Sequence, residues 1–452
     1  MIEFAGRLAD LSPQAKRTLL TQLLRQKVGN SLAYIDRFGV NVKDLRHDAM
    51  LDESIRPDTA RPASADEPAH VLLTGATGFL GAFLLHELLE QSRATVHCLV
   101  RAESVEAASE RLRHTLESYY LWDDSFASRI VPVVGDLATP QLGLSSEARE
   151  TLASEIDVIY HSGAFVNWIF PYERLKPANV QGTEEILRLA STVRLKPVHF
   201  ISSLGVFPLV GQIGVDVVRE SDPLDHGGVL YGGYLQSKWV AESLVQVARA
   251  RGIPVCVYRP GLITGHSETG AWNTRDVTSR MIKSWIELES MPELQFDTSD
   301  MTPVDYISRA VIHLSLRNDS LGQTFHLANP RPVRLGKLAN WIRSLGYPLR
   351  QIPYDVWMAA VLSRNGPSQE DVVSSLVPLF SLTISGNAPN MLRKLPEFDC
   401  TNTLAGLAGS GILCRPVDDR VLQNYFSHFF RRGFLRPPPS NGRAPRQDGP
   451  GR

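Results

Sequence analysis

The stretch from Val71 to Gly81 constrains the fold of this chain more than any other part. It reads V-L-L-T-G-A-T-G-F-L-G, an apolar run that ends in glycines at positions 75, 78 and 81. An apolar helical pattern starts directly after these glycines, which gives the order strand, tight turn and helix. Such a turn lets backbone N–H groups and the positive end of a helix approach a pyrophosphate, and a Cβ at any of the three positions would hinder that approach. The stretch therefore predicts a dinucleotide site; the alternative is a glycine-rich turn without a ligand.

Composition and charge argue against several other classes of protein. The 452 residues are 43% hydrophobic and 21% charged, and no apolar run approaches the roughly 18 residues that a membrane span needs. The formal charge of -1 argues against a nucleic-acid binder driven by bulk charge. The four cysteines are widely spaced without a C-x-x-C pair, so neither a disulfide framework nor a metal site is indicated. Because the N-terminus lacks the layout of a secretory signal, we expect a cytoplasmic protein.

Residues 1–68 do not follow an α/β pattern and are predicted to form a helical segment and a linker. Ser12 and Pro13 can start a helix whose apolar side chains fall on one face. One amphipathic helix cannot bury its own face, so it should dock on the main body or on a neighbouring domain. The polar, proline-bearing stretch 56–68 is the predicted linker. The tail 436–452, rich in proline, glycine and arginine, is predicted to be disordered.

Residues 69–265 predict a Rossmann-type fold, in which a doubly wound parallel sheet alternates with crossover helices. The predicted strands are His70–Thr74, Thr95–Val100, Ile130–Val134, Asp157–His161, Val198–Ser202 and Val255–Tyr258. Helical patterns fall between them at residues 80–91, 104–120, 173–194 and 233–251. In this α/β architecture the ligand lies at the carboxyl ends of the strands.

Residues 266–435 predict a smaller, mostly helical C-terminal subdomain that binds the substrate, with strands allowed to return to the Rossmann sheet. Trp272, Met281 and Trp285 stand among polar residues there, and they either shape a substrate pocket or simply pack. Helical periodicity follows at residues 335–345, 356–361 and 421–429.

The end of the second predicted strand indicates which cofactor the site takes. NAD sites usually place a carboxylate there for the ribose hydroxyl, whereas NADP sites need cations for the 2′-phosphate. Arg101 stands at this strand end, and Arg111 can join it from the next helix, although an isolated helix arginine is more often only solvated. Asp136 follows the third strand and can accept from an adenine amino group. We therefore expect NADPH.

Tyr234 and Lys238 are the candidate catalytic pair. Four residues apart on a predicted helix, they point to the same face, and a nearby ammonium lowers the pKa of a tyrosine. Ser203 follows the fifth predicted strand, from which it can hydrogen-bond the reacting oxygen; the alternative is a serine that caps a turn. The Y-x-x-x-K spacing also occurs by chance in many helices, so the pair gains weight from the nucleotide site before it.

Four motifs, T-G-A-T-G-F-L-G, I-S-S-L-G-V-F, Y-G-G-Y-L-Q-S-K-W-V-A-E and Y-R-P-G, resemble the extended short-chain dehydrogenase/reductase family. More narrowly, the chain resembles the thioester reductase domains that end nonribosomal peptide and polyketide synthases, and their relatives in carboxylic acid reductases. This narrower resemblance rests on L-V-R-A-E-S, H-S-G-A-F-V-N-W, A-N-V-Q-G-T, P-V-D-Y-I and F-D-C-T-N-T, and on the preceding D-L-R-H-D-A-M-L-D-E-S-I-R-P. It covers residues 44–436.

The resemblance implies a catalytic triad of Ser203, Tyr234 and Lys238, with Lys238 also on the nicotinamide ribose. Relatives often have threonine at the position of Ser203 and asparagine at that of Ser162. The residues implied to hold NADPH are Gly75, Thr77, Gly78, Phe79, Leu80, Gly81, Arg101, Arg111, Asp136, Leu137, Ser162, Gly163, Ala164, Tyr234, Lys238 and Gly261.

The implied function is NADPH-dependent reductive release of an acyl or peptidyl thioester from the phosphopantetheine arm of a carrier protein, giving an aldehyde and in a second step an alcohol. The alternatives are reduction of a free aldehyde, ketone or acyl-CoA, epimerisation of a nucleotide sugar, and a module that senses NADPH without catalysis. A hydrolase is disfavoured because Gly265–Gly270 misses the G-x-S-x-G spacing. Too few residues precede the serine motif at 29–32 for a carrier fold, so we expect a monomer that meets its carrier in trans or within a longer synthase.

Overall fold

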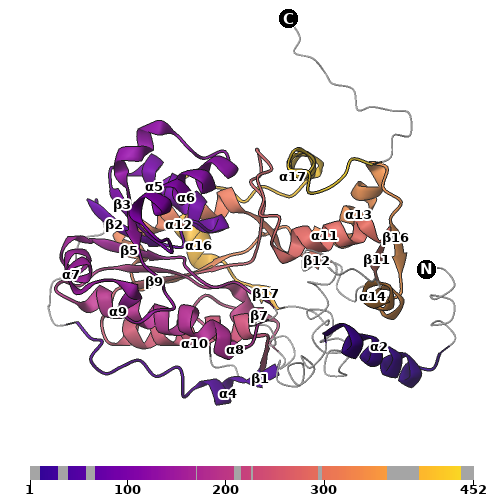
Figure 1. Ribbon diagram of the computed structural model, residues 1–452, viewed down its shortest axis with the longest axis horizontal. Helices are drawn as coiled ribbons and strands as arrows, with labels where there is room; N and C mark the ends of the chain where they lie inside the picture. Colours follow the sequence, from indigo (N-terminus) through magenta and orange to yellow (C-terminus); the bar gives the residue numbers. More distant parts are fainter. Residues whose placement is uncertain are drawn as a thin grey trace, which may run out of the picture.

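A parallel sheet of seven strands forms the centre of the larger of two lobes in this computed structural model (Figure 1). The structure describes residues 11–28, 39–57, 67–168, 170–207, 215–224, 228–293, 298–363 and 396–438. The strand order is β14-β9-β6-β5-β2-β3-β4. The strands are β2 (His70–Thr74), β3 (Thr95–Val100), β4 (Ile130–Val134), β5 (Val158–His161), β6 (Val198–Ile201), β9 (Val255–Pro260) and β14 (Thr324–Leu327).

The doubly wound fold predicted from the sequence is confirmed. Because helices cover both faces of a parallel sheet, its strands read as nearly continuous apolar runs, and all six predicted strands form within two residues of their expected ends. The order of connection reverses between β2 and β5, and such a switch point opens a crevice at the carboxyl ends of the strands. The glycine turn 75–78 follows β2 at this point.

Two apolar layers cover the sheet, one on each face (Figure 1). One contains α5 (Phe79–Gln91), α6 (Val105–Ser118) and α12 (Val304–Ser315). The other contains α7 (Ser146–Glu155), α9 (Gly182–Ser191) and α10 (Gly233–Ala250), joined by α8 (Tyr172–Lys176).

The helix expected at 173–194 forms from residue 172 to residue 191, but it is not α-helical throughout. A π-helical turn at Pro177–Gln181 separates α8 from α9. Pro177 lacks a backbone N–H and its ring crowds the preceding turn, so the regular hydrogen-bond ladder cannot continue through it.

The smaller lobe is built on a third apolar cluster that includes Trp272, Trp285 and Trp357. Its elements are α11 (Val277–Glu287), β11 (Ser290–Pro292), α13 (Leu335–Ser344), β16 (Arg350–Ile352), α14 (Tyr354–Ser363) and α17 (Asp419–Arg431). Between its segments, residues 301–327 return to the larger lobe, where β13 (Met301–Pro303) pairs with β10 (Leu262–Thr264), α12 packs on α5 and β14 joins the sheet. The sequence analysis allowed for such a return without locating it.

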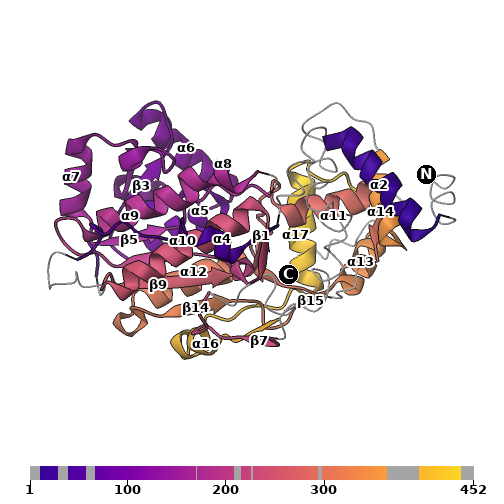
Figure 2. The ribbon, with the colours of Figure 1, turned by 90° about the horizontal axis from the view of Figure 1, so that it is seen from below.

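The N-terminal helix α2 (Pro13–Val28) docks on α14 in the smaller lobe, as its unpaired apolar face predicts (Figure 2). Leu20 is buried in the third cluster, and Lys16 pairs with Asp355 at 3.0 Å. Most of the predicted linker, most of the predicted disordered tail and the serine motif at 29–32 lie outside the described residues. Across the part of the chain that the structure describes, no helix combines the length and the apolar character of a membrane span.

Residues 39–57 form an extended segment, here called the N-terminal arm, along one side of the larger lobe (Figure 2). It consists of β1 (Gly39–Asn41), the short helix α4 (Val42–Leu45) and the irregular stretch that follows. β1 pairs antiparallel with β8 (Val229–Tyr231), which leads directly into α10. Leu51 and Ile55 are buried in the same apolar layer as α10.

Candidate active site

Glycine is needed for different structural reasons at the three positions of the turn. Gly75 has φ 79°, and a Cβ there would lie 2.7 Å from the backbone nitrogen of Gly163. At Gly81 a Cβ would lie 2.0 Å from the carbonyl oxygen of Gly75. For these two positions the need for glycine is thus already set by backbone packing against backbone, which the sequence analysis did not identify. Ligand approach remains the leading reason at Gly78, where the nearest contact of a Cβ would be 3.1 Å.

The first turn of α5 presents backbone N–H groups and no capping side chain. The N-cap residue is the exposed Gly78, and no side chain among the described residues caps this turn. The side chains of Phe79 and Leu80 pack inward, with Phe79 edge-on to Tyr119 at 5.2 Å. A ligand at this helix end would therefore meet backbone donors and the positive end of the helix dipole.

Arg101 and Arg111 come together at the end of β3. Both side chains are exposed, and Nη1 of Arg111 donates to the backbone carbonyl of Arg101 at 2.7 Å. The guanidinium of Arg111 thus reaches the backbone of Arg101 at the end of β3, one strand away from β2 and its glycine turn.

The residues predicted after β4 and β5 pack against one another. Oδ1 of Asp136 accepts from the backbone N–H of Ala138 at 2.9 Å, which fixes the turn after β4. A Cβ at Gly163 would lie 2.6 Å from Cδ1 of Leu137, so glycine is needed for this contact. Ser162 and Ala164 flank Gly163, half-buried, at the carboxyl end of β5.

A buried histidine lies beneath the loop that follows β5 and connects it to β2 and α9. His161 bridges the hydroxyls of Thr74 at 2.8 Å and Thr183 at 2.9 Å, and Thr74 Oγ1 accepts from the backbone N–H of Gly163 at 2.9 Å. Burial lowers the pKa of His161 to about 3, so its imidazole is neutral and can donate to one hydroxyl while accepting from the other.

Tyr234 lies in the first turn of α10 and is half-buried. The ring of Trp168 packs edge-on against it at 5.3 Å. Gly233 lets the helix start close to α8, because a Cβ there would lie 2.4 Å from the backbone nitrogen of Tyr172. The ring of Tyr234 is therefore flanked by Trp168 at the start of a helix that is packed closely against α8.

The expected effect of Lys238 on Tyr234 is wrong for this structure. Burial raises the pKa of Tyr234 to about 12. Burial also lowers the pKa of Lys238 to about 8, against an opposing effect of Glu242. Lys238 donates to the carbonyl of Ile201 at 2.6 Å and lies 4.3 Å from the ring centre of Phe200. The ammonium is directed to the end of β6. The burial of Tyr234 therefore has a larger effect on the pKa of its phenol than the charge of Lys238 has.

Ser203 caps a short turn, as the alternative interpretation proposed. Its Oγ accepts from the backbone N–H of Gly205 at 3.0 Å, at the start of the 3-10 turn Leu204–Val206. That turn packs against α10, so Ser203 and Tyr234 belong to touching elements. The capping bond uses the oxygen as an acceptor and leaves the hydroxyl proton able to donate.

Gly261, at the carboxyl end of β9, has a packing partner of its own. A Cβ there would overlap Oδ2 of Asp300, at 1.5 Å. Asp300 accepts from the backbone N–H groups of Asn329 at 2.7 Å and Leu262 at 3.3 Å. The glycine is thus required by the half-buried carboxylate of Asp300.

Asn179 was not among the residues predicted for the site. Its buried side chain exchanges two hydrogen bonds with the backbone of Phe165, at 2.6 and 3.1 Å, and donates to Ser237 Oγ at 2.9 Å. Ser237 in turn donates to the carbonyl of Tyr234 at 2.8 Å. Asn179 therefore ties the loop after β5 to α10. The available signal was the asparagine of the A-N-V-Q-G-T motif, two residues after Pro177 within a predicted helix.

A buried ion pair between Glu242 and Arg259 was also missed. Their side chains are 0% and 1% exposed, and Nε of Arg259 donates to Glu242 Oε1 at 2.9 Å. The hydroxyl of Ser202 donates to the other carboxylate oxygen, and Arg259 Nη1 lies 3.1 Å from His326 Nε2. The signal was a glutamate on a buried helix face, four residues after Lys238, where an unpaired charge would be costly.

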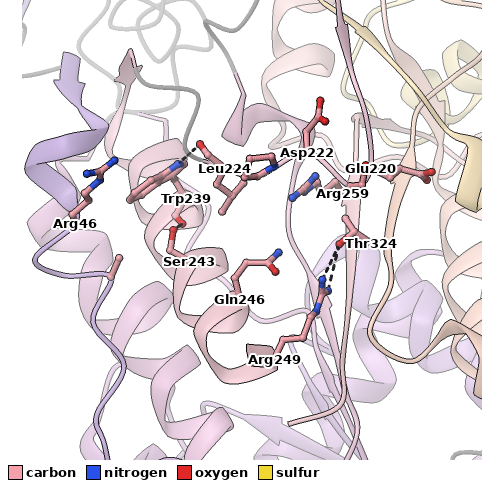
Figure 3. A pocket seen from close by; sticks show the side chains of 13 residues that line it. Arg46, Glu220, Asp222, Leu224, Trp239, Ser243, Gln246, Arg249, Arg259 and Thr324 are labelled. Atoms are coloured by element: carbon pink, nitrogen blue, oxygen red, sulfur yellow. Dashed lines mark hydrogen bonds between the residues drawn. The ribbon is translucent and has the colours of Figure 1, made fainter. Parts of the chain in front are cut away.

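A cavity of about 510 Å³ lies on another face of α10 (Figure 3). Arg46 from the N-terminal arm, Trp239 and Gln246 from α10, and Asp222 contribute to its lining. None of the residues predicted for the cofactor or for catalysis lines it. The chemistry is therefore better located at the strand ends than in this cavity.

Comparison with known proteins identifies the family. Residues 73–311, more than half of the chain, match an NAD-binding family described as male sterility protein. The terminal R domain of the myxalamid PKS-NRPS biosynthetic pathway is 43% identical, with a TM-score of 0.81 over 88% of this chain and 99% of that one. This chain belongs to the family of R domains.

Other relatives of this R domain are parts of larger proteins. The reductase (R) domain of a nonribosomal peptide synthetase from Mycobacterium tuberculosis is 27% identical, with a TM-score of 0.72 over 88% of this chain and all of that one. A linear gramicidin synthase from Brevibacillus parabrevis is 41% identical over 88% of this chain, which spans 8% of that protein. Glycine betaine reductase ATRR of Emericella nidulans is 37% identical over 87% of this chain, which spans 31% of it. The R domain is thus a reductase that binds a nicotinamide cofactor.

Proposed function

We propose that this R domain uses NADPH to reduce an acyl or peptidyl thioester, held on the phosphopantetheine arm of a carrier protein, to an aldehyde. The observation that carries the proposal is that the glycine turn after β2 and the Tyr234–Lys238 pair of α10 share one edge of the sheet. Relatives named as reductase domains of nonribosomal peptide synthetases support the substrate class.

The choice of NADPH over NADH rests on the end of β3. Two exposed guanidinium groups, Arg101 and Arg111, lie there, and arginine matches a phosphate with forked hydrogen bonds. The first turn of α5, without a capping side chain, suits the pyrophosphate. When bound, NADPH supplies the hydride.

The side chains of this R domain supply the proton and stabilise charge. With a pKa of about 12, Tyr234 keeps its proton near neutral pH and can give it to the carbonyl oxygen as negative charge develops there. The hydroxyl of Ser203 donates to the same oxygen. Lys238 holds a positive charge at the carboxyl end of β6. The hemithioacetal then loses its thiol as the C–S bond breaks, which leaves an aldehyde and frees the arm.

A free aldehyde is a second candidate substrate. The aldehyde reductase lnaA of Aspergillus flavus is 35% identical over 84% of this chain. Reduction of an aldehyde needs the same hydride and the same proton from Tyr234, so the two activities can share one site. A second NADPH would in that case carry the released aldehyde to an alcohol.

Product analysis tests the proposal. The purified protein is given an acyl-pantetheine, an acyl-CoA, a separately made acyl carrier protein and a free aldehyde, each with NADPH or NADH. We expect NADPH consumption with the thioesters, strongest with the carrier protein, and an aldehyde or alcohol in the mass spectrum. Turnover of the free aldehyde alone, with no reaction of any thioester, would overturn the thioester assignment.

A further inference from the structure

The N-terminal arm touches two elements that both pack against α10, the helix of Tyr234. β1 pairs with β8, and Asp48 contacts α8. Figure 2 shows β1 and α4 beside α10. The chemistry proposed above uses no residue of the arm, although the arm holds the segment 44–57 that is part of the resemblance to thioester reductase domains.

The first connection runs through β8. Gly39 pairs with Tyr231, and a Cβ at Gly39 would lie 2.8 Å from the ring of that tyrosine, so the two strands are tightly apposed. After Tyr231 the chain turns at Gly232, with φ 86°, and α10 begins at once. Nε2 of Gln236 donates to the carbonyl of Leu230 at 3.0 Å. The arm thus fixes the segment that enters the catalytic helix.

The second connection runs through Asp48. Its carboxylate accepts from the hydroxyl of Tyr172 and from the ammonium of Lys176, both at 2.7 Å. Burial by itself would raise the pKa of Asp48, but these two hydrogen bonds together hold it below the ordinary value. Tyr172 is the first residue of α8, and its backbone nitrogen is the atom against which Gly233 fits. Asp48 therefore fixes α8, against which the first turn of α10 packs.

The far end of the arm is fixed independently. Arg251, just beyond the C-terminus of α10, donates to the carbonyls of Leu51 at 2.9 Å and Ile55 at 3.0 Å. Asp52 contacts Arg188 on α9 at 3.3 Å, whereas Asp48 contacts α8. The contacts near Tyr234 can thus be changed separately from those that attach the rest of the arm.

We propose that Asp48 is a positioning residue for the reduction: by holding α8 through Tyr172 and Lys176, it fixes where α10 begins and where the hydroxyl of Tyr234 lies. This inference rests on the proposed function in that Tyr234 is the proton donor. A hydroxyl displaced by about 1 Å is enough to cost up to 100-fold in rate.

The test compares Asp48→Asn with Asp52→Asn, the same substitution on the same arm. We expect Asp48→Asn to lower kcat by at least about tenfold, with the Kd of NADPH unchanged, while Asp52→Asn stays within about twofold of the parent because its exposed ion pair contributes little. Tyr172→Phe should lower kcat in the same way, and the double variant Asp48→Asn/Tyr172→Phe should lose less than the sum of the two. An Asp48→Asn protein with unchanged kcat and only a lowered Tm would overturn the proposal.

Hydrogen exchange gives a readout that needs no substrate. We expect faster exchange of residues 229–236 in Asp48→Asn than in Asp52→Asn, with the C-terminal half of α10 unchanged in both. Equal exchange in the two variants would overturn the positioning role. If no thioester is turned over by the parent protein, the proposed function fails, and hydrogen exchange still decides the role of Asp48.

Discussion

Nζ of Lys238 lies 2.6 Å from the backbone carbonyl oxygen of Ile201, the last residue of β6. This bond joins the catalytic helix to the strand that leads into Ser203, two residues further on. Because Lys238 makes this bond, its ammonium is directed to the carbonyl of Ile201 rather than to the phenol of Tyr234. The charge of this ammonium is the basis of the pH prediction made below.

Tyr234→Phe removes the proton donor and leaves the ring in place against Trp168. We expect kcat to fall by about 100- to 10,000-fold, the usual contribution of a positioned general acid. The Kd of NADPH, measured by the change in its fluorescence on binding, should stay nearly unchanged. Turnover close to that of the parent protein would contradict the assignment of Tyr234.

The rate should depend on pH through Lys238. Burial lowers the pKa of this residue to about 8, so its protonated form decreases as the pH rises through that value. If the positive charge supports the reduction, kcat declines above about pH 8. The carboxylate of Glu242 opposes the effect of burial, so Glu242→Gln should move the decline to lower pH. A kcat profile flat between pH 7 and 10 would contradict this role.

Glu242→Gln should also destabilise the fold. The substitution leaves the guanidinium of Arg259 buried without its counter-charge, and breaking a buried pair typically costs about 3 to 5 kcal/mol. Arg188→Gln serves as a control, because the ion pairs of Arg188 with Glu184 and Glu185 are partly exposed. The Tm of both variants is the measurement. Equal Tm values for the two variants would show that the buried pair contributes no more than a surface pair.

Arg101→Ala and Arg111→Ala should weaken the binding of NADPH more than the binding of NADH. A hydrogen bond to a charged group contributes about 1.5 to 3 kcal/mol, so we expect the KM for NADPH to rise by about 10- to 100-fold. Arg113→Ala is the control, because Arg113 pairs with Glu117 and lies over the ring of Trp122. An equal rise of the KM for both cofactors would indicate that neither arginine meets the 2′-phosphate.

Two glycine variants should distinguish a glycine needed for backbone packing from one needed for cofactor binding. Alanine usually stabilises a helix relative to glycine by about 1 kcal/mol. Gly81→Ala should do the opposite and lower Tm, because its Cβ would meet the carbonyl oxygen of Gly75 at 2.0 Å. Gly78→Ala, with a nearest contact of 3.1 Å, should lower Tm less and mainly raise the Kd of NADPH. A higher Tm for Gly81→Ala would contradict this interpretation of the turn.

The central strands could be predicted because a parallel sheet buried on both faces leaves an apolar run in the sequence. β14 could not, since Thr324–Leu327 includes His326 and follows a long excursion into the smaller lobe. His326 is buried because Arg259 and the carbonyl of Asp399 satisfy its ring nitrogens, at 3.1 and 2.8 Å. Those partners are distant in sequence, so no local pattern indicates them.

For the site, the sequence indicated which residue types are present but not their electrostatics. Spacing alone puts Tyr234 and Lys238 on one helix face, as expected. Their pKa values depend on burial and on the carbonyl of Ile201, which belongs to another element. Asn179 escaped notice for the same reason, since its three hydrogen bonds all reach outside its own turn.

The return of β14 to the sheet has a consequence for protein engineering. The described residues between β10 and α17 alternate between the lobes, and the edge strand β14 is encoded after α11 of the smaller lobe. A chimaera with one crossover near residue 265 would import a foreign edge strand together with the foreign lobe. To exchange substrate preference between relatives, a graft would need paired breakpoints on either side of residues 301–327 and also around α16 (Thr401–Gly406), which packs on β14.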